Sequence, residues 1–474
     1  MFRLLRVDMA DGRCVCEDIP ARYAGMGGRG LTTSILACEA PLGSGLFGSL
    51  DPGGKMVFSP GLLGATAALS LNRLAMGCES ATGGLQSAAV SCLAATHLLQ
   101  LGILGIIIEN AAPTKTLLQL EIRLDQIRLA PSAVAGMGIV AAMAKLRELH
   151  GPLCSCIAIG LAGENQLPTA NMAFTTSDEY TLRHAGQGGM GAVMGAKGLK
   201  NILVFPPGRA MPPVADAEAY AKAAVRLGVV LNGLSGKGQS DSDRDSNNAF
   251  REGMEQPHAA EGTYQTDKYC LNICRRCGRS LAGRRNKHKE KSAAYKALWP
   301  LATTDSDNEL RARFDSLCDD MGLDVFAVSA AVTACIRSGM LQAGDRAAVV
   351  TAVEQIGADT PLRRMLGGYP EGVPAVLPKK NAVRPGESEQ QRLARDKKHH
   401  VTAFADAMGL CAFAARPVLD SPETQAALVR LLNARYGWAL PTTYACSLGK
   451  RIVEMERKYD CSRQSHFKTQ VKQK

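Results

Sequence analysis

DDMGLD at residues 319–324 and DAMGLC at residues 406–411 are two copies of one pattern, D-x-M-G-L-(D/C), and they agree at four of six positions. A carboxylate close to a glycine in each copy predicts a site that holds two equivalent ligand groups. Asp319 and Asp406 can each accept paired N–H bonds from a guanidine-like ligand edge. Cys411, which ends the second copy, links this site to a metal. The alternatives are a chance match and, for either aspartate alone, a helix cap or a surface acid.

The composition is that of a globular protein with several domains. The chain has 474 residues, of which 46% are hydrophobic and 21% are charged, and it carries a net charge of +11. This length predicts roughly two to four domains. Eight basic residues crowd between Arg275 and Lys291, which is compatible with a nucleic-acid patch. We favour a solvated loop without nucleic acid, because no aromatic side chains interleave for base stacking.

The cysteines and the apolar segments predict a reducing, cytoplasmic location. There are fifteen cysteines, an odd number, and the N-terminus has no apolar signal segment. Clustered cysteines are therefore interpreted as metal ligands rather than disulfides. The longest apolar stretch, residues 88–108, contains His97 and Gln100. It predicts a buried helix over 88–101 and a strand over 103–108, not a membrane span.

The order of patterns along the chain predicts an α+β fold in three domains. A β-rich N-terminal domain covers residues 1–207, and two mainly helical domains cover 208–360 and 361–474. The first domain begins with a hairpin over 2–19 and a glycine-rich turn at 25–31 that opens a helix. It continues with a helix at 136–149 and strands at 154–159 and 202–205. Later helices are expected at 215–231, 308–321, 324–338, 345–355, 400–413, 422–435 and 442–458, with irregular segments at 233–262 and 367–398 and a frayed tail from Ser462.

A glycine-rich run at residues 186–197 predicts a phosphate cradle. Glycines such as Gly188, Gly189 and Gly191 let backbone N–H groups approach an anion, and Lys197 and Lys200 add positive charge. The alternative is a packing turn. The run is not a Walker loop, because a glycine rather than Ser or Thr follows Lys197.

Cys270, Cys274 and Cys277 form a C-x3-C-x2-C cluster, which predicts a metal site. Three thiolates need a fourth ligand, and Cys318, Cys335 and Cys411 are candidates. An iron–sulfur cluster commonly takes one thiolate from a distant part of the chain. A zinc knuckle is the competing interpretation, although the usual second C-x-x-C pair is missing.

In this order along the chain, these segments resemble the aldehyde ferredoxin oxidoreductase family. Its members are tungsten enzymes whose metal is held by two pterin dithiolenes beside a 4Fe-4S cluster. The resemblance covers nearly the whole chain. It is carried by GGRGL at 27–31, IGLAGEN at 159–165, GGMGAVMGAKGLK at 188–200, the three-cysteine cluster, both D-x-M-G-L loops and Cys411.

The resemblance implies a role for each segment. The N-terminal domain is the base on which the pterins lie, and Asp319 and Asp406 are the ligands of the two pterin rings. The remaining implied cofactor-binding residues are Gly322, Asp324, Gly409, Gly188, Gly189, Gly191 and Lys197. Cys270, Cys274, Cys277 and Cys411 hold the cluster, the mononuclear metal is tungsten or molybdenum, and Mg bridges the pterin phosphates.

The implied reaction is oxidation of a small aldehyde, or a related oxo group, to the carboxylate. Two electrons leave through the cluster to ferredoxin or another iron–sulfur subunit, and a homo-oligomer is expected. The chain departs from the family at several places. The middle cysteine is displaced, Gln187 stands where an arginine is usual, and Ala294 and Lys296 replace two acids. The family's histidine has no counterpart, since His399 and His400 are assigned to a basic linker. A member without catalysis, serving as a structural or electron-transfer subunit, is therefore the second hypothesis.

Overall fold

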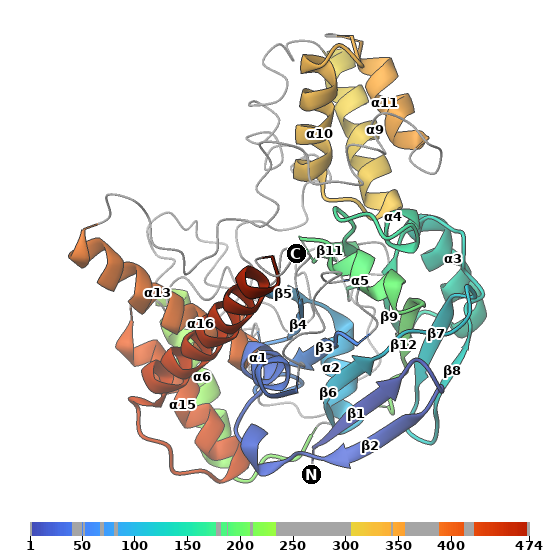
Figure 1. The fold of residues 1–474 in the computed structure, drawn as a ribbon. Coiled ribbons are helices and arrows are strands. Elements are labelled where there is room, and N and C mark those ends of the chain that lie inside the picture. The colour runs from blue at the N-terminus through green and yellow to red at the C-terminus, as the bar shows by residue number, and fades with distance from the viewer. Residues whose placement is uncertain are drawn as a thin grey trace.

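The computed structural model describes residues 2–39, 50, 53–66, 71–79, 84–176, 182–186, 188–208, 212–233, 305–342, 345–355, 388–411 and 421–471. These residues form two six-stranded sheets near the N-terminus and helices that lie mostly later in the chain (Figure 1). The α+β prediction is therefore confirmed. Among the described residues, no helix is both long enough and apolar enough to cross a membrane.

The first sheet has the order β2-β1-β6-β3-β4-β5. Its strands are β1 (Arg3–Asp8), β2 (Cys14–Asp18), β3 (Met56–Pro60), β4 (Arg73–Glu79), β5 (Leu85–Ser91) and β6 (Ile103–Glu109). The predicted N-terminal hairpin is confirmed, because β1 and β2 pair antiparallel with Leu5 opposite Cys16. A short 3-10 helix, η1 (Ala21–Tyr23), follows this hairpin.

The second sheet repeats the path of the first. Its strands are β7 (Leu118–Ile122), β8 (Ile127–Pro131), β9 (Ser155–Ile159), β10 (Met172–Thr175), β11 (Leu182–Ala185) and β12 (Leu199–Val204), in the order β11-β10-β9-β12-β7-β8. In each sheet the first strand of the hairpin pairs in parallel with the strand that comes last in sequence: β1 with β6, and β7 with β12. All other strand pairs are antiparallel. Residues 3–109 and 118–204 therefore use one topology twice.

The helices of the two halves also correspond. Helix α1 (Gly28–Glu39) follows the first hairpin, and α3 (Ile139–His150) follows the second. Helix α2 (Leu93–Gln100) precedes β6, and α5 (Met190–Ala196) precedes β12. One short helix, α4 (Leu161–Glu164), lies after β9. The two sheets and α2 share one apolar core, which includes Phe58, Ile106, Leu98, Ile157 and Ile202.

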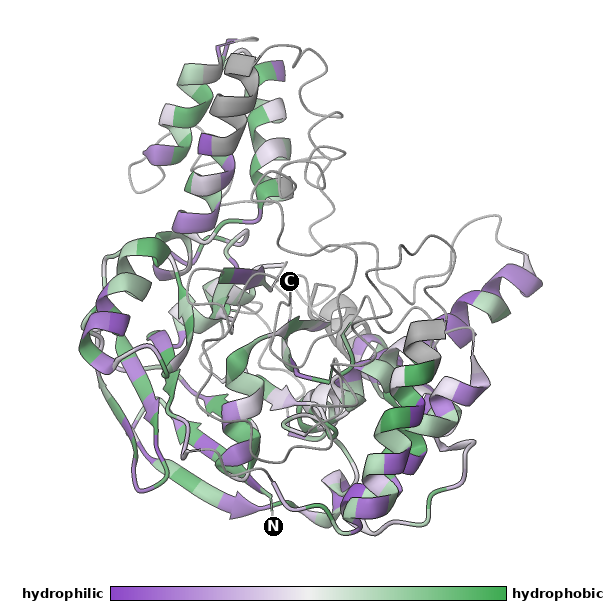
Figure 2. Ribbon diagram, turned by 180° about the vertical axis from the view of Figure 1, so that it is seen from behind, coloured by the Kyte–Doolittle hydropathy of each residue, from purple (hydrophilic) through white to green (hydrophobic). Residues whose placement is uncertain are grey.

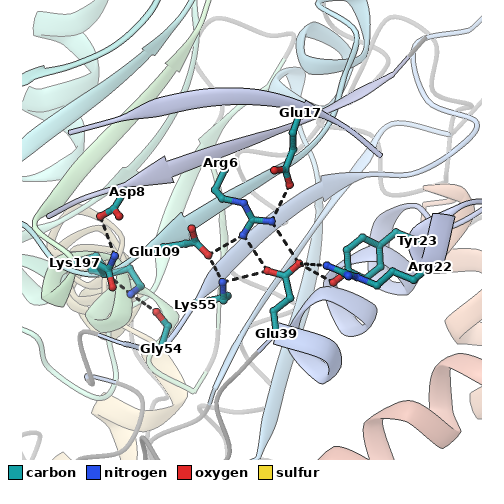
Figure 3. A network of polar contacts seen from close by, with 11 residues as sticks. Arg6, Asp8, Glu17, Arg22, Tyr23, Glu39, Gly54, Lys55, Glu109 and Lys197 are labelled. Carbon is teal, nitrogen blue, oxygen red and sulfur yellow. Dashed lines mark hydrogen bonds and ion pairs between the residues drawn. The ribbon is translucent and has the colours of Figure 1, made fainter. Parts of the chain in front are cut away.

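A polar network ties the end of α1 to the first sheet (Figure 3). Glu39, the last residue of α1, accepts hydrogen bonds from Arg6, Lys55 and the hydroxyl of Tyr23. Burial alone would raise the pKa of Glu39, but these partners lower it to about 2. The carboxylate therefore stays charged and links β1, α1 and the start of β3.

Four later helices pack with α1 over the first sheet: α6 (Ala217–Gly233), α13 (Glu389–Met408), α15 (Pro422–Tyr436) and α16 (Tyr444–Val471). Helix α6 packs against α15, and α13 packs against α16. Helix α13 is polar where it begins and apolar towards Met408, where it enters the core (Figure 2). A second helical group, α9 (Asp305–Met321), α10 (Val325–Arg337) and α11 (Arg346–Glu354), has its own core around Phe314, Val328 and Val353 and stands against the second half of the base (Figure 1).

Three sequence predictions about elements are wrong. The helix expected over 88–101 begins only at Leu93, because Ala89 pairs with Ala75 and extends β5 to Ser91. The irregular segment expected to reach 398 ends earlier, because a capping box of Ser388 and Gln391 starts α13 at Glu389. The tail expected to fray from Ser462 instead continues α16 to Val471. The predicted domain boundaries stay a prediction.

Candidate functional site

Each D-x-M-G-L segment ends a helix. Gly322 follows α9 with φ 73°, and Gly409 follows α13 with φ 82°, in the left-handed region that favours glycine. The next residue closes the helix in both copies: Leu323 N–H donates to Cys318 O at 2.8 Å, and Leu410 N–H donates to Ala405 O at 2.9 Å. Both leucines are buried. These are Schellman helix ends, which explains why glycine and leucine recur together.

The second loop docks on the first half of the base. Leu62 N–H and Leu63 N–H donate to Ala407 O and Met408 O at 3.0 and 3.2 Å, and Arg73 N–H donates to Gly409 O at 3.1 Å. A Cβ added at Gly61, which follows β3, would lie 2.1 Å from the backbone nitrogen of Gly409. The glycine therefore permits direct backbone contact.

The first loop docks at the corresponding place on the second half. Asn171 N–H donates to Gly322 O at 2.8 Å, and Asp324 N–H donates to Thr169 O at 2.9 Å. A Cβ at Gly160, which follows β9 as Gly61 follows β3, would lie 2.3 Å from Met321 O. The two loops thus occupy equivalent positions on a repeated scaffold.

The carboxylate of Asp406 lies in a buried chain of alternating charges. Arg73 Nη1 is 2.7 Å from Asp406 Oδ1, and Arg29 Nη1 is 3.4 Å from Asp406 Oδ2. Arg29 also donates through Nε and Nη2 to the two carboxylate oxygens of Glu456, both at 2.7 Å. Burial alone would lower the pKa of Arg29, but Glu456 and Asp406 raise it. Arg29 therefore stays charged between the two carboxylates.

The first loop is held differently. Asp320 contacts the base: its Oδ1 accepts from Val140 N–H at 2.7 Å in the first turn of α3. Gly138, which precedes α3, leaves room for this carboxylate, because a Cβ there would lie 2.4 Å from Asp320 Oδ2. Asp319 and Asp324 are partly buried. Both loops are thus held by backbone hydrogen bonds; Asp320 adds a bond to the first turn of α3 in the first loop, and Asp406 adds ion pairs in the second.

The glycines of the 186–197 run pack against residues 168–171, the segment on which the first loop docks. Gly188 and Gly189 have φ of 87° and 85° before α5. A Cβ at Gly189 would lie 2.6 Å from Pro168 O, and one at Gly191 would lie 2.4 Å from Asn171 O. These close backbone contacts support the interpretation of the run as a packing turn, and the phosphate cradle stays a prediction. Gln187 lies outside the described residues.

The two lysines of the predicted cradle are engaged inside the fold. Lys197 Nζ donates to Asn110 O at 2.9 Å and to Gly54 O (Figure 3). Lys200 Nζ donates to Met137 O at 2.8 Å and pairs with Glu164. These contacts fix the start of β3 and the loop before α3. From the sequence, both lysines were expected to bind a phosphate, because the sequence does not show which protein oxygens lie near them in the fold.

Of the predicted cluster ligands, only Cys411 belongs to the described residues; Cys270, Cys274, Cys277 and the segment 293–298 lie outside them. Cys411 is partly buried at the end of the second loop. Cys318 and Cys335, the other candidates, are fully buried in the core of α9, α10 and α11. Within the described part of the chain, no group of three or more His, Cys, Asp or Glu side chains is arranged to hold a metal.

The structure also corrects and extends the set of candidate residues. His399 and His400 lie in α13 rather than in a linker. Sequence reasoning missed Arg29, Arg73 and Glu456 as neighbours of Asp406. Arg29 lies within GGRGL at residues 27–31, so the sequence offered a motif that could have identified it. Glu456 carries no local signal, because 427 residues separate it from Arg29.

Comparison with known proteins identifies similar sequences and a similar structure. Residues 4–205 match the family model "Aldehyde ferredoxin oxidoreductase, N-terminal domain". The chain is 29% identical over 222 residues to the tungsten-containing aldehyde ferredoxin oxidoreductase of Pyrococcus furiosus, and 24% identical over 369 residues to that of Thermococcus kodakarensis. These alignments cover 46% and 70% of this chain but only 35% and 58% of the relatives.

The fold is also similar to that of a solved complex. The active-site complex BamBC of benzoyl coenzyme A reductase, solved with 1,5-dienoyl-CoA, superposes with a TM-score of 0.73 at 16% identity. The match covers 97% of this chain and 89% of that chain. At this identity the likeness concerns the fold.

Proposed function

We propose that the chain is a divergent member of the aldehyde ferredoxin oxidoreductase family and an oxidoreductase that holds a tungsten-pterin cofactor between its two D-x-M-G-L loops. One observation carries the proposal: the loops dock at equivalent positions on the duplicated base, at Gly160 and at Gly61. A cofactor with two equivalent pterin rings needs two equivalent sets of ligands. A chance repeat of six residues gives no reason for equivalent docking.

The donor groups in the two loops fit this cofactor. Asp319 and Asp406 are partly buried carboxylates, and a carboxylate accepts the paired N–H groups of an aminopyrimidinone edge. Asp324, Gly322 and Gly409 lie beside them in the two loops, and the two glycines let the loop backbone approach the base closely. A molybdenum cofactor of the same kind would meet the same groups, and Mg on its phosphates would offset their charge.

For the cluster, we propose that Cys411 joins Cys270, Cys274 and Cys277 around a 4Fe-4S centre. The position of Cys411, directly after the second loop, supports its choice over Cys318 and Cys335, which are fully buried in a separate helical core. Electrons would then leave the pterin site by a short path to ferredoxin or another iron–sulfur subunit.

When bound, the cofactor would supply the two-electron redox chemistry and the oxygen transfer. The chain's own part is to bind, orient and handle protons, and here it departs from the family. Ala294 and Lys296 stand where acids are expected. A positioned acid or base is typically worth about 10² to 10⁴ in rate. We therefore propose that oxidation of small aldehydes is slow or absent. The same loss favours the second candidate, a structural or electron-transfer subunit without catalysis.

Metal analysis of protein purified without oxygen tests the proposal. We expect iron near four and tungsten or molybdenum near one per chain, as one cluster and one mononuclear site require. Iron alone would favour the electron-transfer subunit, and zinc alone would contradict both. Dye-linked oxidation of short aldehydes separates the first two candidates, because a working enzyme turns over at about 1 to 10³ per second.

A further inference from the structure

Glu456 forms a two-bond ion pair with the guanidinium of Arg29. Helix α16 brings Glu456 against α1, where Arg29 donates Nε and Nη2 to its two oxygens, both at 2.7 Å. The hydroxyl of Thr33 donates to the same carboxylate at 3.3 Å. Arg29 and Glu456 are each about 7% exposed, so the pair is formed away from water.

This pairing leaves Asp406 unevenly bound. Arg73 Nη1 lies 2.7 Å from Oδ1, a strong charge-assisted distance, whereas Arg29 Nη1 is 3.4 Å from Oδ2. The guanidinium edge that could grip Asp406 with two bonds is already committed to Glu456. Oδ2 therefore retains capacity to accept a strong hydrogen bond from another donor.

We propose that Glu456 is a positioning residue that withholds Arg29 from Asp406, so that Oδ2 can accept N–H bonds from a pterin ring. This inference rests on the proposed function and names a residue far from either D-x-M-G-L loop. Its physical basis is competition. A buried guanidinium without Glu456 would have Asp406 as its nearest carboxylate among the described residues, and a buried charge must be paired. Arg29 would then close on Oδ2 and occupy the ligand's place.

The test is the amount of pterin released, after denaturation, from anaerobically purified full-length protein. Glu456→Gln keeps the size of the side chain and removes its charge, so Arg29 is freed to move onto Asp406. We expect this variant to bind clearly less pterin than the wild type, because the cofactor loses one of its two acceptors while the first loop still holds the other ring.

Two variants on the same helix serve as controls. Asp460→Asn alters a carboxylate one turn further on, which accepts from Leu85 N–H at 2.9 Å and therefore also joins α16 to the base. Ile452→Val weakens the buried contact between α16 and Gly30 without changing charge. Both should retain the wild-type amount of pterin, even where the thermal midpoint falls.

A second substitution distinguishes positioning from simple structural support. In Glu456→Gln with Arg29→Met, the competing cation is gone, and pterin binding should return to the wild-type level. Replacing both members of a buried ion pair by neutral groups is often tolerated in stability. If the single variant does not fold, the double variant alone decides by the same criterion.

The outcomes separate the inference from the proposed function. Wild-type protein without pterin contradicts the proposed function and this inference with it. Wild-type protein with pterin, combined with full retention in Glu456→Gln or no recovery in the double variant, overturns only the role of Glu456.

Discussion

At the scale of single residues, buried polar groups have acquired partners that their sequence neighbours do not reveal. Asp406 is paired with arginines from β4 and α1, and Lys197 donates to backbone oxygens of two loops. Such contacts compensate each buried charge with a partner from a distant part of the chain. They also fix how the protein responds to pH, and His97 gives the clearest case.

His97 should make the protein sensitive to mild acid. Its side chain is buried between the sheets, with Nδ1 3.0 Å from the hydroxyl of Ser155, and burial lowers its pKa to about 4. The unfolded chain binds a proton below about pH 6.5, whereas the native state does not, so stability falls as the pH drops from about 6.5 to 4. The loss is about 3 kcal/mol for a shift of this size.

Thermal unfolding at pH 7 and at pH 4.5 checks this expectation. His97→Gln should show a smaller fall of the midpoint between the two pH values than the wild type. An identical fall in both proteins would mean that other groups, such as carboxylates, account for the acid response.

Cys411 should be required for the proposed 4Fe-4S cluster. A four-thiolate centre loses integrity when any ligand is removed, so Cys411→Ser should lose the brown chromophore and the iron as completely as Cys270→Ser. Cys446→Ser, at an exposed cysteine, is the matched control. Full iron content in Cys411→Ser together with loss in Cys318→Ser would show that the fourth ligand is Cys318.

At the level of secondary-structure elements, glycines let the ends of two helices touch the base. Gly61 and Gly160 each come directly after a strand and meet the backbone of a D-x-M-G-L loop. The D-x-M-G-L repeat is visible in the sequence, and from the sequence we assigned its glycines to ligand binding. The structure shows that Gly322 and Gly409 first serve to end helices. Their role in the fold and a role in binding are compatible, because a helix end leaves the loop backbone facing the base.

Gly61→Ala should destabilise the docking of the second loop. Its φ is not positive, so the cost comes from the contact at 2.1 Å with Gly409, which backbone atoms cannot easily relieve. We expect a loss of more than about 2 kcal/mol, as for other overpacked sites. Gly12→Ala is the comparison: its φ is 76° but nothing lies within 4 Å, so backbone strain alone costs about 1 kcal/mol. Equal midpoints in thermal unfolding for these two variants would contradict the docking argument.

At the scale of the whole molecule, the sequence predicts the α+β class, the N-terminal hairpin and most of the later helices. It does not predict that residues 3–109 and 118–204 share one topology, because the two halves match in strand pairing rather than in any motif identified along the chain. The sequence also predicted helix for the end of β5, residues 88–91, since alanine and serine carry little preference there and the pairing with β4 decides. The candidate site was predictable where it repeats a motif, and not where it draws on Arg73 or Glu456.

We propose that the two D-x-M-G-L loops, placed equivalently on the duplicated base, each bind one pterin ring. The most direct test is the pterin content of anaerobically purified Asp319→Ala, Asp406→Ala and the double variant, beside the wild type. We predict that each single variant binds less pterin than the wild type and that the double variant binds least, because each substitution removes the acceptor for one ring of the same cofactor. Asp345→Ala, which removes only the cap of α11, should retain full content. Unchanged pterin in both single variants would contradict the claim and leave the two loops as helix ends alone.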